Sequence, residues 1–227
     1  MLCLFLQAPF GVFRVFASGS FRPTAGFITP SAAYGLILNA AGVDMRSIDE
    51  DLPMTVIRGG LPSVRLAIAA IEFPALHSLF QQLHNYPVGT TGKERAGATK
   101  GAKYNIIPVR RELLSGLKAY ICLDGNSELE ALLLEGLAGK GRQRYGLPFL
   151  GDNNFLIDRF EPVSDPLPAY WYEMVDESEE GVRDRVTRLS ITIDRADMSR
   201  SRSALFAPTE TKMTEPPPKA WVEINYP

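Results

Sequence analysis

The order in which strand-like and helix-like patterns follow one another most restricts how this chain can fold. Two helical patterns each lie between apolar or β-branched segments that are typical of strands. The order is strand, helix, strand, then strand, helix, strand, which predicts an α+β, ferredoxin-like or RNA-recognition-like sheet with two helices on one face. The expected strands span residues 2–7, 64–73, 106–109, 117–123 and 156–160, and the expected helices span residues 31–41 and 127–138.

The residues around Pro30 mark the start of the first helix. Proline suits a first helical turn because its φ is already near the helical value and its missing N–H would be unpaired there. Thr29 or Ser31 supplies the capping oxygen. Gly42 follows the last apolar position, where a left-handed residue is favoured.

The second helix has equally clear signals at both ends. Asn126 or Ser127 caps it, and Glu128 and Glu130 lie in its first turn, where the helix dipole favours negative charge. Leucines at helical spacing then form an apolar face, and the glycines that begin at Gly139 end the helix.

The composition fits one sizeable folded domain with an addition. The chain has 227 residues, of which 45% are hydrophobic and 22% are charged, enough to build a substantial core. After Pro162 the pattern changes to aromatic, acidic, basic and proline-rich stretches, so we expect residues 161–227 to form a small irregular β extension packed on a main domain of residues 1–160. The net charge of -2 does not indicate a nucleic-acid binder, so charge must be examined locally.

Cys3 and Cys122 both lie in apolar, strand-like stretches. Two cysteines in a chain of this length give no disulfide framework, so we expect two small buried hydrophobic side chains. The apolar start of the chain has no Lys or Arg ahead of it and is interrupted by Pro9, which fits neither a signal peptide nor a membrane span. These features predict a cytoplasmic protein.

Residues 85–105 form a long glycine-containing stretch without apolar periodicity. Long loops in compact domains are often functional, and basic residues with glycines and an aromatic ring suit a phosphate backbone and an unstacked base. A solvated surface loop is the alternative interpretation. The candidate nucleic-acid ligands in and just after this loop, opposed by Glu94 alone, are Lys93, Arg95, Lys100, Lys103, Tyr104, Arg110 and Arg111.

A second candidate is the glycine-rich stretch at residues 139–151. Loops of this kind can present N–H groups to phosphates, and aromatics beside arginine suit stacking on bases. The stretch follows a helix and has no GKS or GKT, so it is not a P-loop. The alternative is a basic helix C-terminus that satisfies the helix dipole. Its candidate ligands are Lys140, Arg142, Arg144, Tyr145 and Phe149.

The remaining residues give no sign of catalytic or metal chemistry. His77 and His84 lack a nearby set of carboxylate or thiolate partners, so we expect no metal site and no cofactor. There is no nucleophile elbow and no carboxylate pair in a glycosidase-like context. Arg14 and Arg22, on the approach to the first helix, are not explained by the helix itself.

Three stretches in order resemble the CRISPR-associated "Cas-five" family of RAMP proteins: LFLQAPFGVFR at residues 4–14, RPTAGFITPSAAYGLI at residues 22–37, and RYGLPFLGDNNF at residues 144–155. Within that family the chain is most similar to the DevS or Myxan-type branch. The resemblance covers residues 1 to about 160 and implies an RNA-recognition-like domain with a protruding thumb at about residues 85–105.

The resemblance also implies a function and partners. The family caps the 5′ handle of the CRISPR RNA (crRNA) in type I Cascade surveillance complexes, which act in antiviral defence. The thumb folds over the guide, and the glycine-rich loop and the face near the first helix hold the handle, which makes Arg14 and Arg22 phosphate ligands. Expected partners are the crRNA, the backbone subunit and the large subunit, with no membrane; contact with target DNA near the protospacer-adjacent motif stays open.

One branch of the family is a metal-independent ribonuclease that processes CRISPR repeat RNA. That branch has a tyrosine four residues before the threonine of its TPSA-like motif, where this chain has Ala25, and a Lys-His pair after the thumb, where this chain has Lys103 and Tyr104. We therefore expect RNA binding without cleavage. The rival interpretations are the ribonuclease and a protein-interaction scaffold that does not contact RNA.

Overall fold

The computed structural model describes the chain except residues 18–19, 48–54, 85–105, 142, 177–182 and 227. Its centre is an antiparallel sheet in the order β5 (Val64–Glu72), β7 (Ile106–Asp124), β1 (Leu2–Gly11) and β8 (Arg159–Val163). Helix α1 (Pro30–Ala40) connects β1 toward β5, and α2 (Ser127–Leu137) connects β7 to β8. This is the strand order of two interleaved βαβ units, so the predicted α+β, ferredoxin-like fold is confirmed.

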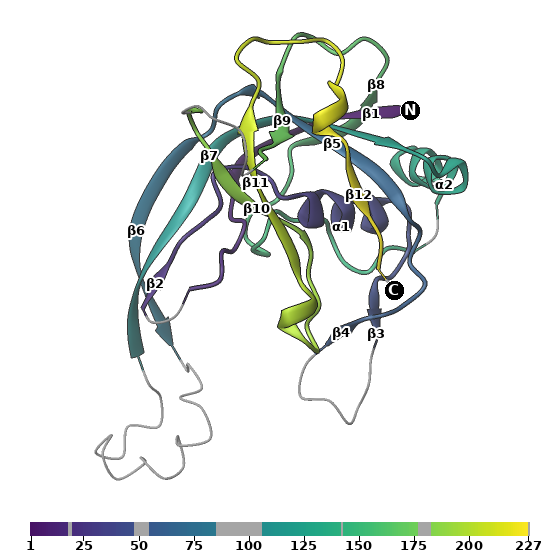
Figure 1. Cartoon of the computed structure of the whole chain (residues 1–227). Helices are drawn as coiled ribbons and strands as arrows, with labels where there is room; N and C mark the ends of the chain where they lie inside the picture. Colours follow the sequence, from purple (N-terminus) through teal and green to yellow (C-terminus); the bar gives the residue numbers. More distant parts are fainter. Residues whose placement is uncertain (18–19, 48–54, 85–105, 142, 177–182, 227) are drawn as a thin grey trace.

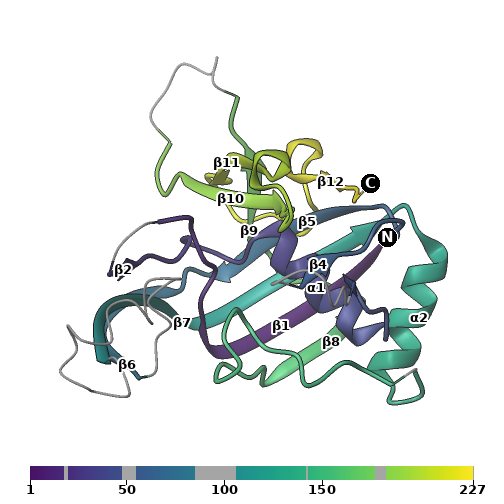
Figure 2. The same ribbon diagram turned by 90° about the horizontal axis from the view of Figure 1, so that it is seen from below.

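Both helices pack on the same face of the sheet. Tyr34 and Ile37 of α1 and Leu133 of α2 share one hydrophobic core with Leu4 of β1 and Ile121 of β7. Figure 2 shows α1 lying across this face. Because side chains alternate along a strand, every second residue from Leu2 to Ala8 in β1 and from Leu117 to Leu123 in β7 points into this core.

The helix caps follow the local sequence. The Oγ of Thr29 accepts the backbone N–H of Ala32 (3.2 Å), which selects Thr29 as the cap of α1, with Pro30 in the first turn. The side chain of Asn126 accepts the N–H of Leu129 (2.9 Å) and caps α2. Each cap satisfies an N–H group that a helix N-terminus leaves unpaired.

Residues beyond β8 extend the same sheet past β5. Strands β9 (Tyr170–Met174), β11 (Arg202–Pro208) and β10 (Thr187–Thr192) follow β5 in that order, and β12 (Val222–Ile224) pairs with the start of β5. The short 3₁₀ helices are η2 (Met198–Arg200) and η3 (Pro218–Ala220).

The second face of the sheet holds a disulfide that the sequence did not predict. Cys3 on β1 and Cys122 on β7 are register partners and form a disulfide bond. They lie in a buried cluster with Tyr120 and Trp171, and the indole N–H of Trp171 donates to the carbonyl of Met213 (2.9 Å). The expectation of two unbonded cysteines is wrong, because the antiparallel register places residues 119 positions apart directly opposite each other.

A two-stranded arm projects from the body of the molecule (Figure 1). It consists of β6 (Ala75–His84) paired with the first half of β7, and β2 (Phe21–Arg22) runs parallel to β7 on the other side. The two strands expected at 106–109 and 117–123 are one continuous strand, and β6 was not predicted. The loop expected as a thumb, residues 85–105, connects β6 to β7 and lies outside the described residues.

Two smaller differences concern the edges of the fold. The strand expected at 156–160 is β8 at Arg159–Val163, while Leu156 makes an isolated bridge with Phe149. A small hairpin of β3 (Arg46–Ser47) and β4 (Val56–Ile57) follows α1.

In the described part of the chain, no helix has the length and apolarity that crossing a membrane requires.

Candidate nucleic-acid interface

The segment after β1, strands β2 and β7, and the turn before β8 meet where the arm joins the body. We call this place the arm base and define it by Arg14, Arg22, Arg111, Asp152 and Phe155. Arg14 follows β1, Arg22 lies on β2 opposite Arg111 of β7, and the other two residues belong to the turn before β8. Residues from four separate parts of the chain therefore form one site.

An ion pair joins the arm to the turn. The Nη2 of Arg111 donates to Oδ2 of Asp152 (2.6 Å), and each side chain is only 14% exposed. The guanidinium also lies 5.6 Å from the ring centroid of Phe155, and Phe155 in turn packs against Phe10 (5.9 Å between centroids). Arg111 therefore connects the arm to the turn, and the carboxylate of Asp152 compensates its positive charge.

The turn is held against the end of β1 by backbone contacts. The N–H of Val12 donates to the carbonyl of Leu150 (3.0 Å). Gly151 has a positive φ of 78°, and a Cβ at this position would lie 1.5 Å from the carbonyl oxygen of Val12. Only glycine permits this approach, so the glycine of the LGDNN segment fixes the turn beside Arg14.

Two hydrogen bonds position Thr24, which precedes α1, against the segment after β1 and against β7. The N–H of Phe13 donates to Oγ1 of Thr24 (2.9 Å), and the N–H of Thr24 donates to a carboxylate oxygen of Glu112 (3.2 Å). Arg14 and Thr24 form an isolated antiparallel bridge. These contacts position the backbone of Arg14, while the side chain of Arg14 is exposed to solvent.

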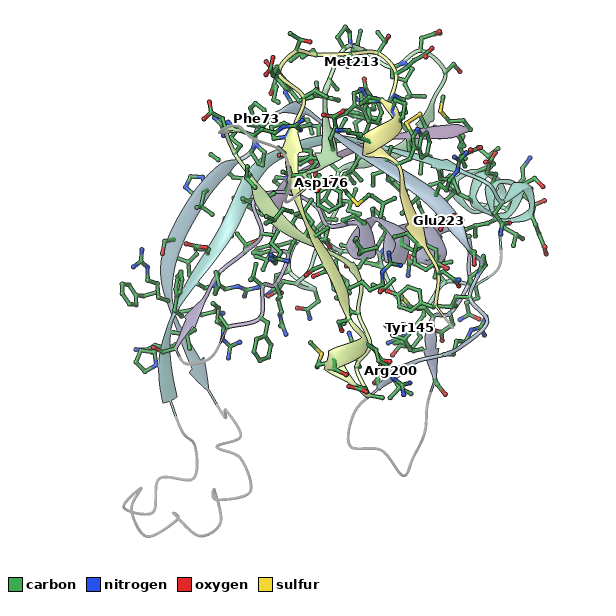
Figure 3. All side chains as sticks on the ribbon, viewed as in Figure 1. Phe73, Tyr145, Asp176, Arg200, Met213 and Glu223 are labelled. Carbon is green, nitrogen blue, oxygen red and sulfur yellow. A yellow bond between two sulfur atoms is a disulfide. The ribbon has the colours of Figure 1, made fainter. Side chains whose placement is uncertain are left out.

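The other glycine-loop candidates lie at the C-terminal ends of the two helices. Arg144 donates from its guanidinium to the carbonyl of Gly136, which satisfies an acceptor in the last turn of α2. The guanidinium of Arg46 lies over one face of the Tyr145 ring, and Asn39 donates to the Tyr145 carbonyl (3.1 Å). Figure 3 shows Tyr145 well separated from the arm.

The structure thus divides the predicted site residues into groups. Arg14, Arg22 and Arg111 are brought together, whereas Arg110 directs its side chain to the opposite face of the arm from Arg111. Lys140, Arg144 and Tyr145 form a second group near the helix ends, and Phe149 is exposed between the two groups. The predicted residues that lie outside the described part of the chain are Lys93, Arg95, Lys100, Lys103, Tyr104 and Arg142.

The electrostatics of the arm base favour an ionised Asp152. Burial by itself raises the pKa of this carboxyl. The N–H of Asn154, the hydrogen bond and charge of Arg111 and the charge of Arg14 act in the opposite direction and hold the pKa of Asp152 below its ordinary value. The carboxylate therefore stays charged and keeps Arg111 in place at neutral pH.

Asp152→Asn is expected to lower the free energy of unfolding by about 1–2 kcal/mol near neutral pH, between the values for exposed and buried pairs. Because the pKa is depressed in the folded state, this stabilisation is complete above the ordinary carboxyl pKa and is lost as the pH falls through the folded-state pKa. Denaturant titrations of both proteins from about pH 6 to about pH 3 should show the difference shrinking. A difference that is independent of pH would contradict the assignment.

Two residues of the arm base lie in the motif at residues 144–155 but were not among the predicted ligands. Asp152 and Phe155 are 41 and 44 positions from Arg111, so only the folded register reveals their contact with it.

A further group of exposed cations lies on the β10–β11 hairpin and the turn that joins its strands. The sequence shows them only as a basic, alternating stretch, and they are Arg188, Arg195, Arg200 and Arg202. The described residues contain no group of three His, Cys, Asp or Glu side chains that could hold a metal ion.

This fold is shared by a number of solved structures, among them the following two. A chain of a structure described as "CRISPR RNA-guided surveillance complex" aligns with a TM-score of 0.59 and 17% identity, over 93% of this chain and 90% of its own length. A second, described as "Crystal structure of Cas protein", aligns with a TM-score of 0.51 and 16% identity, over 95% of this chain and 99% of its own. No protein-family model and no curated protein matches the sequence. At these identities the likeness shows a common fold.

Proposed function

We propose that this protein is an RNA-binding, non-catalytic subunit of a CRISPR surveillance complex and holds the 5′ end of the guide RNA. The observation that carries the proposal is the likeness along nearly the whole chain to a subunit of an RNA-guided surveillance complex. The motif resemblance at residues 4–14, 22–37 and 144–155 points to the 5′-handle-capping subunit of type I Cascade within that class.

The geometry of the arm base supports a role in RNA binding. Arg14 is exposed and stands beside the turn that the Arg111–Asp152 ion pair connects to the arm. Phe149 and Tyr145 are also exposed, and aromatic faces beside cations bind unstacked bases. Among these residues, Arg14 is the clearest phosphate ligand and Tyr145 the clearest stacking surface.

The absence of cleavage is part of the proposal. Metal-independent RNA scission needs a base near the 2′-OH and a cation for the developing negative charge. The position at which the ribonuclease branch has its tyrosine holds Ala25, which is buried and has no group that transfers protons. Incubating the chain with repeat RNA at equal concentration, without metal ions, tests this: the RNA stays intact if the proposal is correct.

Arg14→Ala is expected to reduce the affinity for the repeat-derived 5′ RNA fragment and to make log K less dependent on log salt by about 0.7, the value for one phosphate contact in a single strand. Fluorescence anisotropy at several salt concentrations measures both quantities. Arg159→Ala is the matched control, because Arg159 is an exposed arginine on β8 that pairs with Glu161 away from the arm base. Equal salt slopes for the two variants would remove Arg14 from the interface.

Tyr145→Ala is expected to weaken binding of the same RNA by about 1–3 kcal/mol, the range for loss of one base-stacking side chain. Tyr145 is 64% exposed, and Arg46 covers one face of its ring, so we expect a base to stack on the other face. Tyr145→Phe keeps the stacking surface and should retain the affinity. If the alanine variant binds as tightly as the phenylalanine variant, the stacking role is wrong.

A further inference from the structure

Strand β6 presents a long edge without the features that normally protect one. Among the described residues its pairing partner is β7, so its other edge has unpaired N–H and C=O groups. The ten residues ALHSLFQQLH contain no Asp, Glu, Lys, Arg, Pro or Gly. Edge strands of soluble proteins are usually short or carry charges, proline or bulges that prevent pairing with other chains.

The opposite edge of the sheet shows this protection clearly. Strand β8 has five residues, and it contains Pro162 and the exposed Arg159–Glu161 ion pair. The same chain therefore protects the edge of β8 and leaves the edge of β6, which is twice as long, without these features. This contrast indicates that the edge of β6 is kept available for pairing.

Strand β6 carries three large apolar side chains that are exposed. Leu76 is 59% exposed, Phe80 is 82% exposed, and Leu79 on the other face of the strand is also exposed. Leu76 and Phe80 share one face of the strand, so together they present an exposed apolar surface next to the unpaired edge. They give a partner strand side-chain contacts in addition to backbone hydrogen bonds.

The side chain of Arg110 places a positive charge near the middle of the β6 edge. The Nε of Arg110 donates to Oγ of Ser78 (2.8 Å), which carries the guanidinium from β7 across onto β6. Leu76, Ser78 and Phe80 lie on the same face as Arg110, because their register partners on β7 are the even-numbered residues from 110 to 114. The carboxylate on this face, that of Glu112, already accepts the N–H of Thr24.

A pocket of about 260 Å³ lies at the start of the same face. Leu76, Leu114, Phe73 and Tyr172 line it, and Arg185 stands at its wall with the guanidinium carbon 4.3 Å from the Phe73 ring centroid. Leu76 belongs both to the pocket and to the edge strand. An apolar side chain of a strand paired with β6 therefore has a place to insert at this end.

We propose that β6 is the docking edge for an extended segment of another protein chain, which adds a strand to the arm. On the face that carries Arg110 this segment places an apolar side chain at the pocket beside Leu76, an acidic one opposite Ser78 and an apolar one against Phe80. Since alternate residues of a strand share a face, its pattern is apolar, any, acidic, any, apolar.

A second copy of this chain is a poor occupant of the edge. Antiparallel self-pairing of β6 in the registers that put equivalent faces of the two copies on the same side brings Arg110 of one copy onto the same face as Arg110 of the other. Like charges that face each other across paired strands are unfavourable. An acidic segment from a different protein satisfies Arg110, so charge complementarity selects it. This inference concerns protein docking and does not depend on RNA binding.

Selection of randomised seven-residue peptides, displayed on phage, against the full-length chain tests the proposal. The enriched peptides should show the apolar–acidic–apolar pattern at alternate positions. A synthetic peptide of the enriched sequence should bind at least about 10-fold more weakly to Arg110→Glu, and exchanging its acidic residue for lysine should restore binding to that variant. Arg159→Glu, on the protected edge, should bind like the unaltered chain, and thermal unfolding checks that both variants are folded.

Backbone methylation separates strand addition from ordinary side-chain contact. N-methyl groups on one set of alternate residues of the peptide should abolish binding, and the same groups on the other set should leave it unchanged, because only one set donates to β6. Enrichment of a different pattern, or equal effects of the two methylation frames, would overturn the proposal. So would self-association of the chain that Arg110→Glu abolishes, or displacement of the peptide by an RNA oligonucleotide that binds the same arginine.

Discussion

Reduction of the Cys3–Cys122 disulfide is expected to lower the free energy of unfolding by about 4 kcal/mol, because the bond closes a very long loop in the unfolded chain. The bonded residues are 119 positions apart, and both lie in the buried cluster of Trp171. Denaturant titration followed by tryptophan fluorescence, on oxidised and reduced samples of the same protein, measures the difference directly.

The control for this experiment is the Cys3→Ala/Cys122→Ala double variant. Its stability should not respond to the reductant, which separates loss of the bond from any general effect of the reagent. Identical unfolding curves for the oxidised and reduced protein would contradict the prediction. Two free thiols in the intact mass of folded protein purified without reductant would contradict the disulfide itself.

Gly136→Ala is expected to destabilise the fold by about 3 kcal/mol or more, at the upper end of the range for overpacked sites. Helix propensity alone favours alanine over glycine by about 1 kcal/mol. Here, however, a Cβ would lie 1.8 Å from the carbonyl oxygen of Ala40, a backbone atom that cannot rotate away. The ends of α1 and α2 would have to separate, which would also disturb the contact between Arg144 and the Gly136 carbonyl.

Gly35→Ala provides a matched comparison within the other helix. A Cβ at Gly35 would meet Met45 Sδ at 3.6 Å, an ordinary contact. The propensity gain should therefore appear without penalty, as stabilisation of up to about 1 kcal/mol. Opposite signs for the two substitutions in thermal or denaturant unfolding are the expected result, and equal signs would show that the close approach of the helices is not as described.

The local signals of the sequence were enough for the body of the fold. Capping residues, proline at a first turn and apolar spacing identify both helices within a residue or two, since each of these effects acts over one or two turns. The order of the elements then leaves few arrangements for the sheet. The side chains that cap the helices, Thr29 and Asn126, were among the candidates at each end.

These local sequence signals did not predict the arm. Strand β6 carries leucine at positions 76, 79 and 83, a spacing that does not alternate, and the first half of β7 interrupts its apolar residues with Arg110, Arg111 and Glu112. Residues 75–80 of β6 are exposed, so no buried face imposes a two-residue period there, and in the first half of β7 Arg111 separates the buried Val109 and Leu113 on one face. The disulfide and the Arg111–Asp152 pair are likewise consequences of register rather than of sequence neighbourhood.

The sequence analysis proposed arginines as phosphate ligands without the internal contacts that two of them make. A stretch of arginines near glycines indicated phosphate binding, yet Arg111 and Arg144 make internal contacts that stabilise the fold. Charge in a sequence does not distinguish a cation that is satisfied within the protein from one that remains available. The structure leaves Arg14 exposed, and it positions the turn at residues 150–155 beside it.

The most direct test of the proposed function is ultraviolet cross-linking of the full-length chain to the repeat-derived 5′ RNA fragment, with the cross-linked peptides identified by mass spectrometry. The proposal predicts cross-links in the segment that follows β1 and in the stretch from Tyr145 to Phe155, and their loss when a scrambled RNA of equal length is used. Cross-links confined to β8 and β12, or equal labelling by the scrambled RNA, would contradict it.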